Sequence, residues 1–180
     1  VVPASRASPL GTALLTEVVQ LMPSAYEMEE IHAFKGAEGN KTMEIHAVDT
    51  NPFAALVFKT HSEPHIGDVS FFRIFSGKVI SGQDVFNATR DCAEKLGHLS
   101  VAQGKDRVEV PVLYAGDIGC VAKLRNTHTN DTLSTKEHPV RLPQIFFPES
   151  VAEFAVHATA RHVEEKLQFG LQRLHDEDPT

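Results

Sequence analysis

The stretch FFRIFSGKVISGQDVF, residues 71–86, carries the pattern that decides the fold. Apolar and polar residues alternate on both sides of two Ser-Gly pairs, a period of two that is typical of half-buried β-strands. We expect Gly77 to lie in a tight hairpin turn and Gly82 in a second turn or a bulge. Glycine adopts backbone angles that other residues avoid, and a small barrel needs them where its strands bend sharply.

Further strand-like runs fill the chain between residues 52 and 142. Turn signals separate them, among them SGQD, NTHTND and the AGD that places Gly116 and Asp117 in a turn. Many short strands with no helical pattern between them predict a mainly β fold, a closed barrel or a sandwich. The runs are FAALVFKT, DVSFFRIF, KVI, DVFNAT, EKLGHLSVAQG, VEVPVLYAG, IGCVAKL and HPVRLPQ.

The residues before the barrel predict a helix followed by a connector. Residues 12–22 have an amphipathic helical pattern that Thr12 can cap and Pro23 ends. Its apolar face is formed by Leu14, Leu15, Val18, Val19 and Met22. Residues 24–51 are polar and punctuated by glycine, so we expect a connector with at most one weak strand at each end.

The residues after Pro143 predict one strand and one helix. SVAEFAVHA, residues 150–158, alternates as a strand, and residues 161–177 follow a helical period that Asp178-Pro179 ends. The helix has Val163, Leu167, Gly170, Leu171 and Leu174 along one face. One strand and one helix cannot cover their own apolar surface, so we expect this tail to be the start of an incomplete domain, with its face packed elsewhere or frayed.

Composition and charge exclude several classes of function. No run of about 18 apolar residues is present, so no membrane span is expected. The two cysteines, Cys92 and Cys120, form no CxxC pair, which favours a reduced, cytoplasmic protein. The net charge of −7 argues against a general nucleic-acid binder, but residues 52–143 hold 11 Lys/Arg and 10 Asp/Glu while the flanks hold 6 and 14. The middle of the chain therefore has room for a local basic face.

The residues predict no catalytic, cofactor or metal site. No GxxxxGK[ST], GxGxxG or GxSxG motif occurs. His61 and His65 have a spacing that suits a metal on a helix, but Pro64 favours a solvated loop. The carboxylates of EMEE, residues 27–30, are typical of a solvated face. Two interpretations remain for Phe71, Phe72 and Phe75: an aromatic platform on which bases stack, or part of the barrel core.

Several segments together resemble translation elongation factor G and its paralogues. NPFAALVFKTHSEPHIGDVSFFRIFSGKVISGQDVFNAT is similar to the start of that family's second domain, and YAGDIGCVAKLRNTHTNDTL to its later strands. FFPESVAEFAVHATARHVEEKLQFGLQRLHDEDPT resembles the opening of the third domain. GTALLTEVVQLMPS resembles the helix that closes the GTPase domain. SVAQGKDRVEV and THTNDTL are more similar to the factor G-like paralogues than to the housekeeping factor.

The resemblance implies a fragment of a longer, cytoplasmic translational GTPase that promotes ribosomal translocation. Residues 1–23 would be the end of the GTPase domain, and residues 24–51 would connect it to the next domain. Residues 52–142 would form the domain II β-barrel, and residues 143–180 would begin a ferredoxin-like third domain. GTP and Mg²⁺ would be cofactors of the parent protein, with none in this fragment. A ribosomal-protection or release-type factor with the same barrel is the alternative.

The implied partners are small-subunit ribosomal RNA and the protein's own GTPase and third domains. In that family the barrel contacts the RNA, so basic residues in or beside its strands are the candidates for weak phosphate contacts. For Arg73 two roles are open, bracing the barrel or facing RNA, and a barrel that only braces its neighbours is a further alternative. The candidates are Arg73, Lys78, Lys105, Arg107, Lys123 and Arg125.

Overall fold

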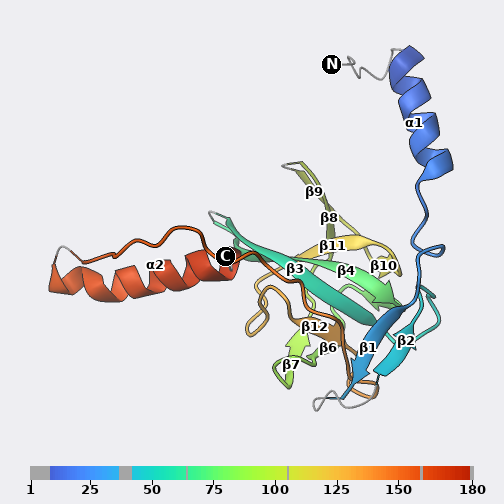
Figure 1. The fold of residues 1–180 in the computed structure, drawn as a ribbon. Coiled ribbons are helices and arrows are strands. Elements are labelled where there is room, and N and C mark those ends of the chain that lie inside the picture. Colours follow the sequence, from blue (N-terminus) through green and yellow to red (C-terminus); the bar gives the residue numbers. More distant parts are fainter. Residues whose placement is uncertain (1–8, 37–41, 64, 105, 159, 179–180) are drawn as a thin grey trace.

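The computed structural model describes residues 9–36, 42–63, 65–104, 106–158 and 160–178. The fold is mainly β, as predicted: strongly curved, barrel-like sheets form the centre, and one helix projects from them on each side (Figure 1). Neither described helix is long and apolar enough to cross a membrane.

Ten strands of the described chain build the barrel. An eight-stranded antiparallel sheet has the order β7-β6-β12-β3-β4-β11-β8-β9, and β10 pairs with β5 beside it. Most predicted runs are strands, but EKLGHLSVAQG and VEVPVLYAG each divide in two, and β12 was missed within the sequence after NTHTND. The strands are β3 (Ala54–Glu63), β4 (Gly67–Ser76), β5 (Lys78–Ile80), β6 (Asp84–Asn87), β7 (Cys92–Lys95), β8 (Ser100–Gln103), β9 (Asp106–Glu109), β10 (Val112–Tyr114), β11 (Ile118–Ala122) and β12 (Thr132–Ser134).

Strand β3 is buried on both faces because it separates two apolar cores. Ala55 and Val57 point into the barrel core with Phe72 of β4. Ala54 and Leu56 point outward into a second core. A strand that is covered on both sides has a continuous apolar run, here AALV, in place of alternation.

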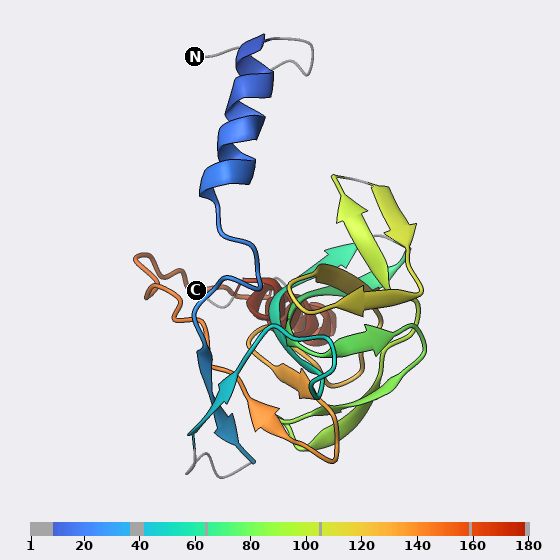
Figure 2. The ribbon, with the colours of Figure 1, turned by 90° about the vertical axis from the view of Figure 1, so that its right-hand side faces the viewer.

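The segment expected as a connector contains the strands that cover the outer face of β3. β1 (Ile31–Lys35) and β2 (Thr42–Ile45) pair antiparallel, and β1 also pairs with β13 (Val140–Arg141). Figure 2 shows this small sheet beside the barrel. Burial of its apolar side chains against β3 is a tertiary effect, which the short and polar local pattern does not reveal. The second core consists of Ala33, Ile45, Ala54, Leu56, Val140 and Leu142.

Gly77 occupies a corner between two sheets, and the predicted hairpin turn at this position is wrong. β4 pairs with β3 and β11, whereas β5 pairs with β10, so the chain changes sheet at Gly77. Its φ is +71°, and a Cβ here would lie 2.5 Å from the carbonyl oxygen of Asn51. Gly82, with φ +83°, lies in the turn that the Gln83 N–H to Ile80 O hydrogen bond closes at 3.1 Å.

Gly116 and Asp117 form the turn between β10 and β11. Gly116 has φ +93°, and the Asp117 carboxylate accepts a hydrogen bond from the backbone N–H of Tyr114 at 2.8 Å. The turn is also tied to β4, because Gly116 N–H donates to Ile74 O and Ile74 N–H donates to Asp117 O. The AGD sequence thus supplies both the left-handed residue and the local acceptor that the turn needs.

A buried polar cluster joins the turn after β6 to the loop before β12. The Asp131 carboxylate, which is nearly fully buried, accepts from Asn87 Nδ2 at 3.0 Å, Arg90 Nε at 2.7 Å and His128 N at 2.9 Å. Thr127 links the cluster to the buried Glu94, donating to its carboxylate at 3.2 Å. The buried carboxylates here have partners, which is the condition for burying them.

Helix α1 (Pro9–Leu21) confirms the helix predicted near the N-terminus, but not its cap. The helix already includes Pro9, a favourable first-turn residue, so Thr12 lies within it and its carbonyl accepts from Thr16 Oγ1. The apolar face is exposed, with Val19 at 82%. Figures 1 and 2 show α1 standing away from the barrel.

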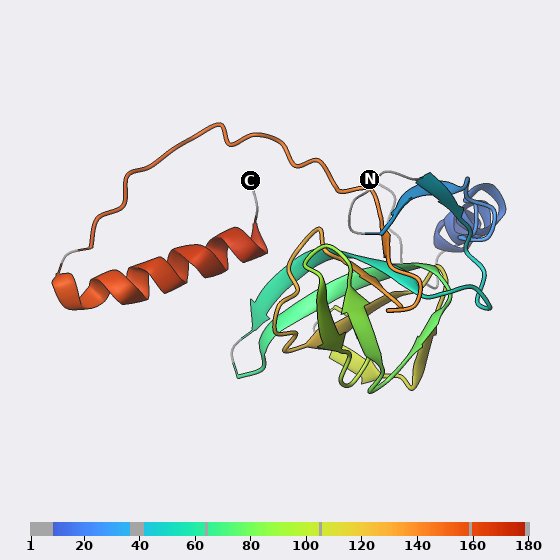
Figure 3. The ribbon, with the colours of Figure 1, turned by 90° about the horizontal axis from the view of Figure 1, so that it is seen from below.

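The tail forms the predicted helix without the predicted strand. η1 (Arg161–Val163) leads into α2 (Glu164–Glu177), whose last turn lies against the tip of β3. Residues 150–158 are extended but pair with no described strand. Figure 3 shows the chain before α2 extending away from the barrel with no strand beside it. A strand needs a neighbour for its backbone hydrogen bonds, and alternation alone does not supply one. Of the predicted apolar face, Val163 and Leu167 are half-buried and Leu174 is exposed.

Candidate nucleic-acid interface

Arg73 lies on the outer face of β4, under the segment that precedes and follows the β1–β2 hairpin. Its guanidinium carbon is 5.4 Å from the centre of the Phe75 ring, and the pair lines a small hollow with Ala25, Ile31 and Ala47. The arginine is half-buried, and its Nε has no hydrogen-bond partner among the described residues. This position favours the bracing alternative over contact with RNA.

Three candidates are exposed and free of ion pairs with described residues: Lys78, Lys123 and Arg125. Lys78 opens β5 and pairs in register with Tyr114 of β10. Lys123 follows β11 with φ +64°, and its backbone N–H donates to Asp68 O at 2.8 Å. Because the β5 pair and the end of β11 belong to different sheets, the three cations do not share one strand face.

Arg107 differs from these three, because it forms an ion pair with Glu63. The pair joins β9 to the end of β3, and both side chains are mostly buried, at 21% and 27% exposure. Part of the charge that Arg107 could offer a phosphate is therefore engaged within the protein. Lys105, the remaining candidate, lies outside the described residues.

The structure also contains a groove that sequence reasoning missed, which we call the β3–β9 groove. It has a volume of about 550 Å³ and lies between the outer face of β3 and β4 and the β8–β9 ribbon. The residues that matter for its chemistry are Phe58, Lys59, His61, Glu63, Phe71 and Arg107.

Two details of strand pairing place the aromatic rings in this groove. Phe72 is fully buried in the barrel, so its neighbour Phe71 points outward. Val57 points into the barrel core, so alternation places Phe58 on the outer side. The register of β3 against β4 shifts between Val57 and Lys59, so a bulge leaves Lys59 on that outer side as well, paired with Phe71. Of the three phenylalanines considered as a platform, Phe72 is core, Phe75 lies beside Arg73, and Phe71 is the one in the groove. Alternation along β4 places Phe72 on the face opposite to Phe71 and Phe75, so the three rings form no common platform.

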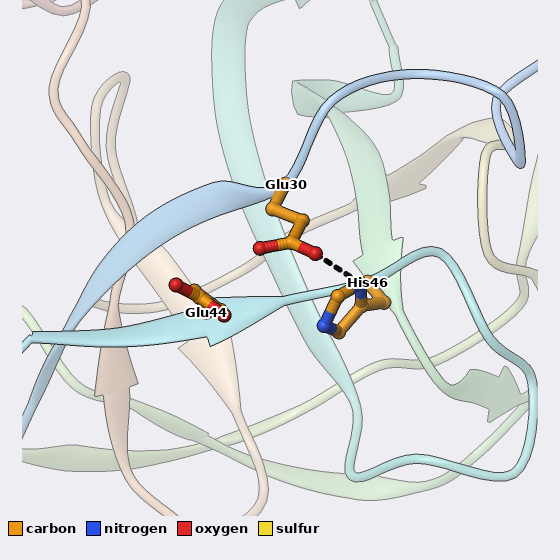
Figure 4. Close-up of side chains that lie close together, drawn as sticks. All are labelled: Glu30, Glu44 and His46. Atoms are coloured by element: carbon orange, nitrogen blue, oxygen red, sulfur yellow. Dashed lines mark ion pairs between the residues drawn. The ribbon is translucent and has the colours of Figure 1, made fainter.

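A cluster of possible metal ligands lies elsewhere, on the β1–β2 hairpin. One ligand atom each of Glu30, Glu44 and His46 lies within 4.8 Å of the others, and all three residues are exposed (Figure 4). His46 Nδ1 is 3.7 Å from the Glu30 carboxylate. Exposed carboxylates gather in this way without an ion, so the cluster by itself assigns no metal site. His61, by contrast, faces Glu177 of α2 at 3.9 Å.

Comparisons with known proteins agree on one family. Residues 52–136 match the family described as Elongation factor G domain 2. The chain is 41% identical over 167 residues to Elongation factor G of Dehalococcoides mccartyi, a match that covers 93% of this chain and 24% of that protein. A crystal structure from Thermus thermophilus matches with a TM-score of 0.70 and 27% identity, over 93% of this chain and 23% of that one. The chain thus spans about a quarter of the relatives it matches.

Proposed function

Since residues 52–136 belong to the elongation factor G domain 2 family, we propose that the chain is the ribosome-contacting part of an elongation factor G-type GTPase. In this proposal the parent protein acts in the cytoplasm and promotes ribosomal translocation. The barrel touches small-subunit ribosomal RNA, and the helices at either side pack against the remainder of the GTPase domain and of the third domain.

The observation that carries the proposal is the distribution of charge on a barrel of this family. Lys78, Lys123 and Arg125 are exposed and unpaired within the described residues, while the acidic excess lies outside residues 52–143. Phosphate contacts are made by such cations, and they need no recognition helix and no base-reading sheet. We therefore expect contacts that depend on shape and charge.

The helices support the proposed contacts within the parent protein. Leu14, Leu15 and Val19 of α1 are each more than half exposed, an apolar face that is typical of a surface covered by another domain. On the other side, the apolar face of α2 is partly open, with Leu171 44% and Leu174 63% exposed. The GTPase domain would cover α1, and the remainder of the third domain would cover α2.

GTP and Mg²⁺ enter the proposal as cofactors of the parent protein. Binding of a nucleoside triphosphate requires a cradle of backbone N–H groups, a lysine and a hydroxyl that holds Mg²⁺. No sequence motif for that cradle occurs in this chain. We expect isothermal calorimetry with GTP and Mg²⁺ to detect no binding by the 180-residue chain, and micromolar binding would contradict this expectation.

The test of the RNA contact uses the full-length factor. Lys78, Lys123 and Arg125 are changed together to glutamate, and binding to small ribosomal subunits is measured over a range of salt concentrations. We expect weaker binding and a salt dependence that is shallower by about 0.7–0.9 in log–log slope for each phosphate that is no longer engaged. The control changes Lys35, Lys95 and Lys136 to glutamate, because these exposed lysines alter the net charge equally. Equal binding by both triple variants would favour a barrel that only braces its neighbours.

A further inference from the structure

We infer that the β3–β9 groove binds one unpaired RNA nucleotide, with its base against Phe58 and Phe71 and its phosphate near Lys59 and Arg107. The inference rests on the proposed function only in taking RNA as the partner. It adds a second kind of contact, base stacking, to the phosphate contacts proposed above.

The aromatic lining is the first argument for a base. Phe58 and Phe71 are half-buried, so each ring is held by the sheet yet keeps a part accessible from the groove. Phe58 faces outward because it follows the inward-pointing Val57, and the bulge after Val57 places Lys59 on the same side as the two rings. Stacking of a base on one aromatic ring raises affinity by about 5- to 150-fold, whatever the base.

The size of the groove is the second argument, and it favours a single nucleotide. Its volume of about 550 Å³ lies within the range of about 300–1,000 Å³ that holds small ligands. A base inside a duplex is stacked on its neighbours and cannot present a face to a side chain. The occupant is therefore unpaired, as in a loop, a bulge or a strand end.

The charge of the lining is the third argument. Lys59 is exposed at the groove, and the Arg107 guanidinium keeps N–H donors beyond the one that meets Glu63. Among the lining residues two cations, Lys59 and Arg107, face one carboxylate, that of Glu63, within a chain of net charge −7. An anionic nucleotide fits this lining better than a run of acidic side chains does, because the nucleotide carries a flat ring together with its negative charge.

The experiment measures binding of a short single strand to the 180-residue chain. The probe is a tetra-adenylate ribo-oligonucleotide with 2-aminopurine at one end, whose fluorescence is quenched when the base stacks. We expect quenching by the wild-type chain, and affinity about tenfold lower in Phe71→Leu and in Phe58→Leu. The matched control is Phe146→Leu, since Phe146 is 99% exposed and lies outside the groove. A blunt-ended, GC-rich duplex, in which every base is paired, should not compete.

A second measurement does not depend on the variants folding. Adenosine 5′-monophosphate is titrated into the wild-type chain, and backbone amide shifts are followed by NMR. Shifts that cluster at residues 58–61 and 71 support the groove, and shifts elsewhere overturn it. Equal affinity of Phe71→Leu and Phe146→Leu for the tetranucleotide would also overturn it. Either result would overturn the groove and leave the proposed function in place. The proposed function itself would fall if the Lys78, Lys123 and Arg125 triple variant bound small subunits as tightly as its control variant.

Discussion

At the scale of single residues, Gly77 and Gly82 have the same left-handed φ for different reasons. The Gly77 position is closed, because backbone atoms of Asn51 and Phe53 approach the place where a Cβ would stand. The Gly82 position is open, with nothing within 4 Å of the place where its Cβ would stand. The first glycine is needed for backbone angle and close approach, and the second for backbone angle alone.

We expect Gly77→Ala to destabilise the chain more than Gly82→Ala. The left-handed φ costs an alanine about 1–2 kcal/mol at either position. At Gly77 the clash with backbone adds about 1–3 kcal/mol, because the neighbouring atoms cannot move as a side chain can. Urea unfolding followed by circular dichroism measures the difference, and equal free energies of unfolding for the two variants would contradict the close approach.

The two cysteines should differ in reactivity with iodoacetamide. Burial raises the pKa of the Cys120 thiol, whose residue is 1% exposed, and it also raises the pKa of the half-buried Cys92. A raised pKa lowers the thiolate fraction at neutral pH, so both thiols react slowly and faster as pH rises. Mass spectrometry should find Cys92 modified first and Cys120 only under unfolding conditions. Equal rates in the folded chain would show that Cys120 is accessible.

At the scale of elements, the polar cluster around Asp131 decides how β6, β7 and β12 meet. The segment from 125 to 131 has no regular structure, yet its backbone donates to the buried Glu94 and Asp131 carboxylates. The DTL sequence therefore has a structural role. The Asp131 carboxylate accepts the hydrogen bonds of the cluster, and Leu133, two residues later, packs in the barrel core.

Asp131→Ala should lower the free energy of unfolding by about 2–3 kcal/mol. The change removes the acceptor of the His128 N–H and the nearest of the three acceptors of the buried Asn87 Nδ2, which costs more than the net value of a hydrogen bond. Asp84→Ala is the control, because Asp84 is an exposed aspartate on β6 and should change stability by no more than about 0.5 kcal/mol. Chemical denaturation of the two variants tests this, and similar losses would exclude a special role for the cluster.

At the scale of the whole molecule, the barrel and its second core hold the buried apolar residues, while both helices stand outside them. The last turn of α2 touches the barrel through polar contacts, such as His128 with Asp176 at 3.2 Å and Ser62 N–H with Glu177. Between barrel and α2 the extended segment carries aromatic residues in the open, with Phe146 at 99% and Phe154 at 88% exposure.

Brief digestion with chymotrypsin should therefore cut the chain after Phe146 and Phe154 before it cuts the barrel. Extended backbone without a partner strand can bind directly in the active-site cleft of the protease. Cleavage at Phe53 or Phe72 requires the barrel to open first. Mass spectrometry of the fragments identifies the cuts and their order. Early cleavage after Phe72 would show that the barrel opens more easily than its packing indicates.

The sequence alone determined the mainly β barrel, both helices and the resemblance to elongation factor G, because these depend on local signals. Alternation of period two, glycines at turns and helical periodicity act over a few residues, and the family motifs are read in order along the chain. The position of the AGD turn follows from the same local chemistry.

Only the tertiary structure decided which faces were buried and which residues met. The chain turns a corner at Gly77 because β5 pairs with β10. Residues 150–158 form no strand because no described strand lies beside them. Arg73 lies beside Phe75, Arg107 lies beside Glu63, and a bulge places Lys59 in the groove next to Phe58. These arrangements depend on which strands pair and in what register, and pairing between strands is set by long-range packing that no local pattern contains.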